Sequence, residues 1–255
     1  MIAGSLFHFT NDLKTLQIIL ESQRLRASYN IEDIRGFYPD EQFLAIPMVC
    51  FCDIPLKNVS DNHTEIYGVF GLGFKKVWGI KNGINPIMYR TENSFIEQYI
   101  LTLTGETQSI FVELEKFKKS QELKFVSEFE NINLSINNLK SCALNLAGFI
   151  KIYEDSLAKG VNYYLEREWR WVPGQTEKIF SASNSKQTKI DINKIYHKNP
   201  DFLNFTLDDL RYVIVEKKSD IVAAVSLIGS FSISEMEKGM LIQKIIDIES
   251  INQDM

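Results

Sequence analysis

Apolar and polar positions near the N-terminus change from a strand-like to a helical pattern. The segment SLFHFT at 5–10 is mostly apolar, as at the start of a β-strand, although His8 interrupts it. Leucine and isoleucine then recur at spacings of three and four, which predicts a helix capped by Asn11 or Asp12. The apolar positions of this helix are Leu13, Leu16, Ile19 and Leu20. His8 is therefore expected where a strand ends before a helix N-terminus, a junction that suits an anionic or nucleotide ligand; the alternative is an ordinary hydrogen-bonded histidine at the core edge.

The next strand predicted from the pattern is PMVCFCDIP at 47–55, with a proline at each end. Alternation places Val49 and Phe51 on one face and Cys50 and Cys52 on the other. The preceding stretch, 31–46, is mixed and predicts a loop or a short helix. Further strands are expected in 68–74, 85–90, 163–173 and 210–216, and the segment 178–183 is a candidate partner for 163–173.

Helical spacing dominates the middle of the chain, between residues 94 and 155. A first helix is expected to end at Gly105, and the charged segment 115–130 reads as a solvated helix or a loosely packed insertion. A second helix is expected over 136–154. Towards the C-terminus, 220–228 fits either a helix or a buried strand, and 234–248 predicts a closing amphipathic helix.

The order of these segments predicts the fold class. A β-rich part, a helical part and a second β-rich part favour one α+β domain over 1–255, with a helical insertion at about 94–155. The glycines of 68–74 have neither the spacing nor the following helix of a dinucleotide-binding turn, and no phosphate-binding loop is found. We therefore expect a mixed or antiparallel sheet rather than a doubly wound parallel one.

Composition narrows the class of protein further. With 255 residues and a net charge of −5, the chain lacks the basic balance of a general nucleic-acid binder, although a local basic groove is still compatible. The cysteines, Cys50, Cys52 and Cys142, form no disulfide framework, and His63 does not complete a zinc site with them. No signal peptide and no membrane-spanning stretch are visible. The expectation is a cytoplasmic protein without a metal.

The clearest chemical pattern is LEREWRW at 165–171. In a strand, Glu166, Glu168 and Arg170 share one face, while the tryptophans lie on the opposite, packed face. Two carboxylates and a guanidinium are costly inside an apolar core, and they suit the wall of a polar cleft. The alternative is a solvent-exposed strand face with cross-strand Glu–Arg pairs.

Other candidate positions lie before and after the glycine-containing strand. Tyr67 precedes Gly68 and is placed to present its ring in a groove, where aromatic faces stack on planar ligands, or else to pack at the core edge. Lys75 and Lys76 are either phosphate contacts or solvated edge lysines. His197 lies in a predicted loop without a partner that the sequence identifies.

Several of these blocks together resemble the AbiGi family of abortive-infection phage-resistance proteins. The blocks are LFHFT, VCFCDIP, the glycine-containing strand ending in FKK, NPIMYR and EREWRWVP, and they cover most of 5–90 together with 163–173. The resemblance implies a role in phage defence. It also implies an antitoxin of an abortive-infection pair, whose partner resembles a nucleotidyltransferase toxin.

The first block is also similar to the first motif of DarT-type ADP-ribosyltransferases. This resemblance implies an ADP-ribosyltransferase-like sheet core in which His8 and Thr10 hold NAD and Tyr67 stacks on its nicotinamide. It further implies that Glu168 is the catalytic carboxylate and that Glu166 helps to activate the acceptor, which is a nucleic acid or a protein. A fixed carboxylate would stabilise the positive charge that develops on the ribose when NAD is cleaved.

The sequence departs from the DarT pattern in one respect, because no clear counterpart of the arginine-bearing loop after the first helix is found. Arg24, Arg26 and Arg35 are candidates for it. Three hypotheses follow: a transferase used in phage defence, a non-catalytic antitoxin or regulator that binds a partner toxin, and a ligand sensor without turnover.

Overall fold

A computed structural model describes residues 4–35, 42–59, 67–120, 126–154, 162–174 and 176–253. A central sheet contains, in spatial order, β13 (Ile245–Asp247), β12 (Leu210–Val215), β5 (Phe70–Lys75), β1 (Ser5–Thr10), β4 (Phe43–Cys52), β9 (Glu168–Trp171) and β6 (Asn85–Pro86). Two more strands, β3 (Ser28–Asp33) and β10 (Phe180–Ser181), also pair with β4. All neighbours are antiparallel except β12 and β13. The predicted α+β class and mixed, mainly antiparallel sheet are confirmed.

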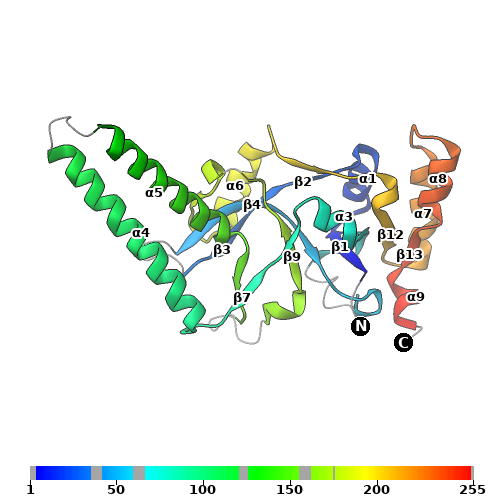
Figure 1. Cartoon of the computed structure of the whole chain (residues 1–255). Helices are drawn as coiled ribbons and strands as arrows, with labels where there is room; N and C mark the ends of the chain where they lie inside the picture. Colours follow the sequence, from blue (N-terminus) through cyan, green and yellow to red (C-terminus); the bar gives the residue numbers. More distant parts are fainter. Residues whose placement is uncertain are drawn as a thin grey trace.

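Helices pack on this sheet and on each other (Figure 1). They are α1 (Leu13–Ser22), α3 (Lys76–Lys81), α6 (Lys186–Tyr196), α7 (Lys218–Gly229), α8 (Glu235–Ile242) and α9 (Ile248–Gln253). The predicted first helix is confirmed: Asp12 caps it by accepting from the Thr15 amide at 2.7 Å, and Leu16 is buried against the sheet. Among the described residues, none of the helices combines the length and apolar character that a bilayer crossing requires.

Pro47 lies inside β4 rather than at its end, so the boundary predicted at this proline is wrong. Tyr29 of β3 pairs with Pro47, but the backbone N–H and C=O of Tyr29 are bonded to the Asn193 side chain, at 2.7 and 3.0 Å. Tyr29 and Pro47 are therefore a pair without ladder hydrogen bonds, where the missing proline N–H costs nothing. The strand consequently extends back to Phe43 and includes part of the predicted loop 31–46, of which 36–41 lie outside the described residues.

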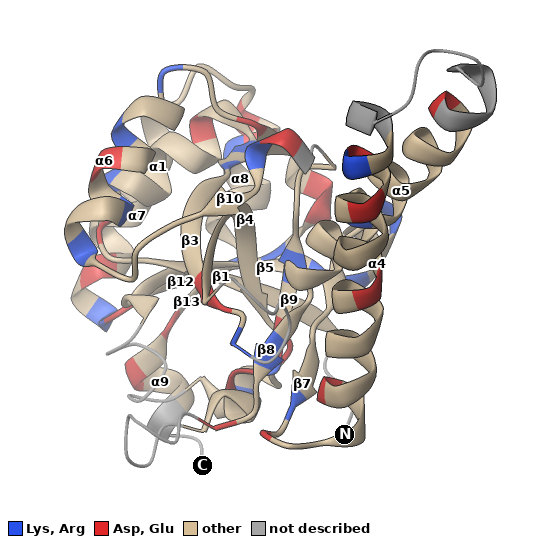
Figure 2. Cartoon of the chain, turned by 90° about the vertical axis from the view of Figure 1, so that its left-hand side faces the viewer, with Lys and Arg blue, Asp and Glu red and all other residues tan. Residues whose placement is uncertain are grey.

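The helical insertion is an antiparallel hairpin of α4 (Phe95–Ser120) and α5 (Val126–Ala147), which projects from the body of the molecule (Figures 1 and 2). The helix end predicted at Gly105 is wrong, because α4 continues for four further turns; residues 121–125 of the charged segment lie outside the described residues. The hairpin connects β7 (Met88–Arg90) to β8 (Ile150–Ile152), which form a separate parallel pair. Ile150 is thus in a strand and not in the predicted helix.

Three other predicted boundaries and one predicted pairing also differ. The segment 85–90 divides into β6 and β7, which belong to different sheets, and 163–173 begins with a 3₁₀ turn, Tyr163–Glu166, before β9. The segment 178–183 pairs with β4 and not with β9, because β9 already has β4 and β6 as neighbours. The closing helix stops at Ile242, since β13 adds to the sheet edge beside β12. The ambiguous 220–228 lies in helix α7.

A second small sheet pairs β2 (Arg24–Arg26) with β11 (Phe202–Asn204). The main apolar core lies between the central sheet and α1, α3 and α7, with Trp78 and Phe74 stacked at 4.5 Å between ring centroids. Trp169 and Trp171 pack against this core, as the alternation of β9 predicts. The opposite face of β9 carries the polar side chains Glu168 and Arg170, whereas the same face of β4 carries Leu44, Ile46 and Met48 of a second apolar cluster.

Candidate functional site

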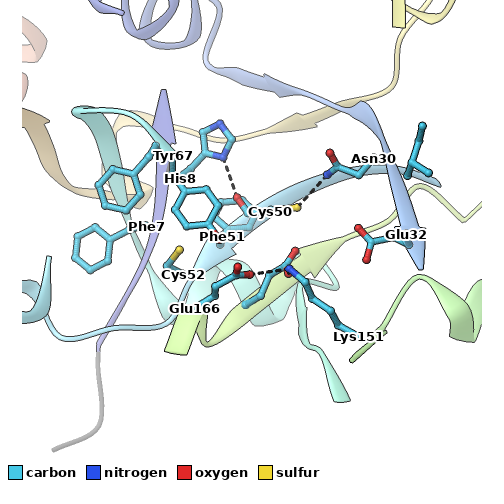
Figure 3. Close-up of a pocket in the computed structure, with 13 residues that line it drawn as sticks. Phe7, His8, Asn30, Glu32, Cys50, Phe51, Cys52, Tyr67, Lys151 and Glu166 are labelled. Carbon is cyan, nitrogen blue, oxygen red and sulfur yellow. Dashed lines mark hydrogen bonds and ion pairs between the residues drawn. The ribbon is translucent and has the colours of Figure 1, made fainter. Parts of the chain in front are cut away.

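A cavity of about 260 Å³ opens on this polar face, beside β1, β4 and β9. Figure 3 shows an aromatic side, with Phe7 and Tyr67, and a charged side, with Glu32, Glu166 and Lys151. The volume lies just below the range of about 300 to 1,000 Å³ that is usual for small-molecule sites. The cavity is therefore large enough for one part of a dinucleotide.

Glu168 and Arg170 form the buried base of the charged side. They are two residues apart on β9, so both point to the same face, and the register places them opposite Cys52 and Cys50 of β4. Arg170 Nε lies 2.7 Å from Glu168 Oε1, and its Nη2 lies 3.1 Å from Glu168 Oε2. The remaining contacts of Arg170 are to Glu32 Oε2 and to the Gly148 carbonyl oxygen, each at 2.9 Å.

The same charges control the ionisation of Glu168. Burial alone raises the pKa of this carboxyl group, but the positive charges of Arg170 and Lys151 outweigh burial and lower the pKa to about 2. Glu168 is therefore ionised throughout the physiological pH range. Arg170, which is fully buried, is in turn compensated by Glu32 and Glu168.

Lys151 of β8 joins the two carboxylates that the sequence singles out. Its Nζ lies 2.7 Å from Glu166 Oε2 and 3.1 Å from Glu168 Oε2. Burial opposes the charge of Lys151, but the neighbouring carboxylates dominate and raise its pKa above the ordinary value. Three carboxylates (Glu32, Glu166 and Glu168) and two cations (Lys151 and Arg170) thus form one cluster with a net charge of −1.

Tyr67 closes the cavity from the aromatic side. Burial raises the pKa of its phenol, and the adjacent Glu166 carboxylate, which accepts a hydrogen bond from it, raises it further. Tyr67 therefore stays protonated and acts as a donor. Gly68 has φ +105°, and a Cβ at this position would overlap the carbonyl oxygen of Thr10. The glycine lets the Tyr67 segment approach the end of β1 closely.

His8 lines the cavity with its imidazole ring. Its Nδ1 lies 2.9 Å from the carbonyl oxygen of Cys50, and because a carbonyl only accepts, Nδ1 carries the proton. Burial lowers the pKa of His8, so the ring is neutral and Nε2 has a free lone pair. Neutral Nε2 suits a hydroxyl donor such as a ribose hydroxyl.

The structure thus brings together four of the five site residues expected from the sequence. His8, Tyr67, Glu166 and Glu168 line the one cavity, whereas Thr10, at the end of β1, does not line it. Glu166 reaches the cavity from the 3₁₀ turn before β9, not from the strand itself, because Arg167 adopts a left-handed conformation between them.

Two charged residues that line the cavity were not anticipated from the sequence. Lys151 lies in a segment expected to be helical, and only the short apolar alternation IKI at 150–152 indicates a strand there. Glu32 lies at the end of β3, in the stretch expected to be a loop or a helix.

Several other candidates have structural partners away from the cavity. Lys76 pairs with Asp53 at 2.5 Å, and His197 Nε2 lies 3.0 Å from Ser28 Oγ, a partner that the sequence did not identify. The candidate arginines do not line the cavity: Arg24 lies over the ring of Phe202, and Arg35 pairs with Asp33.

No metal site is found in the part of the chain that the structure describes, where no three His, Cys, Asp or Glu side chains gather to hold an ion. His63 lies outside this part. Cys50 and Cys52 line the cavity, and burial raises the pKa of both thiols, that of Cys52 to about 12. They are neutral thiols rather than thiolate ligands.

A family model and a similar protein both relate this chain to the same family. A family model described as "Putative abortive phage resistance protein AbiGi, antitoxin" matches residues 26–216. An "Abortive phage resistance protein AbiGi" from Lactococcus lactis subsp. cremoris is 29% identical over 238 residues, covering 82% of this chain and 88% of that protein. No solved structure matches. The family match includes Tyr67, Lys151, Glu166 and Glu168 and the whole hairpin, and it begins after His8.

Proposed function

The chain belongs to the AbiGi family of abortive phage resistance proteins, and from this premise we propose that its cavity binds NAD and supports ADP-ribosyl transfer during phage defence. The observation that carries the proposal is the meeting of His8, Tyr67 and Glu168 in one cavity. These residues come from three segments far apart in the chain. They are the positions to which the DarT resemblance assigns NAD binding and catalysis.

The chemistry of the cavity fits the nicotinamide–ribose end of NAD. The aromatic side offers the Tyr67 ring as a stacking surface for nicotinamide. Unprotonated His8 Nε2 accepts a hydrogen bond from a ribose hydroxyl, and Glu168 supplies a fixed negative charge near the sugar. The volume of about 260 Å³ leaves the adenosine half to extend outside.

In this proposal, the bond between ribose C1′ and the nicotinamide nitrogen breaks, and its electron pair leaves with neutral nicotinamide. The ribose becomes positively charged, and the carboxylate of Glu168 stabilises that charge. A nucleophile on a nucleic acid or protein acceptor then bonds to C1′ and loses its proton to Glu166. Because Arg170 and Lys151 already bind Glu168, the net charge of −1 on the whole cluster, rather than an isolated carboxylate, provides the stabilisation.

Titration calorimetry with NAD and a nicotinamide-release assay test this proposal on the wild type and on Glu168→Gln. Release is measured with and without DNA, RNA and protein acceptors. We expect both proteins to bind NAD and only the wild type to release nicotinamide. Absence of binding would refute the proposal, and binding without release by the wild type would favour the ligand sensor without turnover.

A second candidate function is that of an antitoxin, and the description of the family supports it. Under this candidate the protein binds and neutralises a partner toxin, and the exposed apolar surface of the α4–α5 hairpin supplies a docking face. This candidate expects a toxin gene beside that of the protein, and co-expression with that toxin distinguishes the candidates. A non-catalytic antitoxin relieves toxicity equally well as the wild type and as Glu168→Gln, whereas an enzyme requires Glu168.

A further inference from the structure

A lysine outside the charged cluster reaches the edge of the cavity. Lys189 of α6 places its Nζ 2.6 Å from the side-chain oxygen of Asn30, and Asn30 lines the cavity. The amide nitrogen of Asn30 donates to the sulfur of Cys50 at 3.6 Å, which leaves the amide oxygen to accept from Lys189. An ammonium group is therefore held beside the cavity wall.

The packing of α6 along β3 explains why Lys189 reaches this point. Three contacts, each four residues apart on α6, join the helix to consecutive residues of β3: His197 to Ser28, Asn193 to Tyr29 and Lys189 to Asn30. The helix and the strand consequently run in opposite directions. The first turn of α6 thus lies beside the half of β3 that lines the cavity, from Asn30 to Glu32.

Lys189 differs from the cations of the cluster in its partners. Lys151 and Arg170 are ion-paired with three carboxylates. Among the residues that the structure describes, no carboxylate lies within 4 Å of Lys189 Nζ, and the group that Nζ contacts there is a neutral amide. Lys189 is also exposed. Its positive charge is therefore accessible to an anion at the mouth of the cavity.

The charges around the cavity are thus unequal at its two edges. Figure 3 shows His8 and Asn30 along one edge and Glu166 and Lys151 along the opposite edge. The first two are neighbours because both contact Cys50: His8 Nδ1 lies 2.9 Å from its carbonyl oxygen, and Asn30 contacts its sulfur. The cluster, with its net charge of −1, repels a phosphate group, whereas Lys189 attracts one.

A ligand whose ribose is bound at His8 would have its next group near Asn30, and in NAD this next group is the diphosphate. We propose that Lys189 binds the diphosphate of NAD at the mouth of the cavity, and so selects ligands that carry phosphate on this ribose. An ammonium group has three donors, so Lys189 can bind a phosphate oxygen while it keeps its contact with Asn30. This inference rests on the proposed function, for which it assigns the residue that holds the diphosphate.

Three ligands separate the phosphate contact from the others: NAD, ADP-ribose, which lacks nicotinamide, and nicotinamide riboside, which lacks phosphate. Titration calorimetry measures the affinity of each for the wild type and for Lys189→Met. The variant should bind NAD and ADP-ribose about tenfold or more weakly, because a charge-assisted hydrogen bond to phosphate is lost. Its affinity for nicotinamide riboside should equal that of the wild type. Lys189→Arg should retain most of the affinity for NAD, since a guanidinium also binds phosphate.

The matched control is Lys194→Met, which removes another exposed lysine of α6. Lys194 lies five residues beyond Lys189, on a different face of the helix, and its variant should bind NAD as the wild type does. Added salt provides a second readout that a merely structural role would not change. It should weaken NAD binding more in the wild type than in Lys189→Met, because salt screens the charge of an exposed lysine. Circular dichroism establishes that both variants are folded.

Equal affinities of NAD for the wild type and Lys189→Met would overturn the inference while the proposed function stands. An equal loss in Lys194→Met, or an equal loss for nicotinamide riboside, would overturn it as well. If the wild type binds none of the three ligands, the inference and the proposed function both fail. Binding of ADP-ribose that depends on Lys189, without release of nicotinamide from NAD, would support the inference and contradict the proposed transfer.

Discussion

Arg170 binds the carboxylate of Glu168 through two nitrogen atoms, at 2.7 and 3.1 Å, although both residues lie on the same strand. Side chains two residues apart on a strand share a face, and here burial draws them into a single ion pair. This pair is both the base of the cavity wall and a source of stability. The two contributions can be separated by mutation.

Replacement of Arg170 by Met should destabilise the protein strongly. The change leaves Glu168 and Glu32 buried without their shared cation, and removing one partner of a buried pair costs about 3 to 5 kcal/mol. Urea denaturation measures the loss. The control is Lys116→Met, which removes an exposed pair with Glu113 and should cost less than about 1 kcal/mol. Equal losses in the two variants would contradict the role of Arg170.

The stability of the protein should fall in acid because of Glu168. Its pKa in the folded protein is about 2, below the ordinary 4.5, so folding favours the ionised form. This contribution is fully present above about pH 4.5 and is lost as the pH falls towards 2. Urea midpoints of the wild type should decline through this window, and those of Glu168→Gln should decline less. Parallel pH profiles of the two proteins would argue against this assignment.

His8 and Thr10 should differ in their effect on ligand binding. His8→Ala removes a ring that lines the cavity and, if NAD binds there as proposed, should weaken NAD binding about tenfold or more, since the ribose hydroxyl would lose its acceptor. Thr10→Val is the matched control from the same strand and should leave the affinity nearly unchanged, because Thr10 does not line the cavity. Calorimetric titration measures both. A larger effect of Thr10→Val would place the ligand elsewhere.

Gly68 should tolerate alanine less well than Gly83. Both have positive φ, but a Cβ on Gly68 would overlap the Thr10 carbonyl, whereas nothing lies within 4 Å of a Cβ on Gly83. We expect Gly83→Ala to cost about 1 kcal/mol and Gly68→Ala about 2 kcal/mol or more, as measured by thermal or urea unfolding. If Gly83→Ala were the more damaging change, the close approach at Gly68 would not be a constraint.

The three cysteines should react with a thiol reagent in two phases. Cys142 is exposed on α5, whereas burial raises the pKa of Cys50 and Cys52 and depletes their thiolates. Absorbance after addition of a disulfide reagent at pH 8 should show one fast thiol and two slow ones. Cys142→Ser should remove the fast phase alone. Reaction of all three thiols at one rate would contradict the burial of the cavity wall.

Sequence reasoning named four residues that line the cavity, His8, Tyr67, Glu166 and Glu168, and it assigned their roles through the DarT resemblance. His8 precedes a helix N-terminus, and Glu168 alternates with the packed tryptophans of β9. Their proximity depends on β4, which pairs with both β1 and β9, and that long-range pairing is not visible in either segment. Lys151 was missed because a three-residue strand after a long helix is too short to produce a distinct period.

Two element boundaries predicted from the sequence are wrong, and each error has a local physical reason. Pro47 looks like the end of a strand, but it sits at a pair that needs no ladder hydrogen bond, because Asn193 binds the backbone of its partner Tyr29. Gly105 looks like a helix end, yet the hydrogen bonds of α4 continue through it. Helical spacing also gives no distinction between apolar residues that the fold buries and those it leaves exposed, as at Leu103 and Leu139.

The parallel pairing of β7 with β8 has a consequence for the hairpin between them. Parallel neighbours cannot be joined by a tight turn, and the minimum crossover is about a dozen residues. The connection from 91 to 149 is several times longer, so sheet geometry leaves most of its length unconstrained. Whole turns can therefore be added to or removed from this arm without shifting a strand of the central sheet.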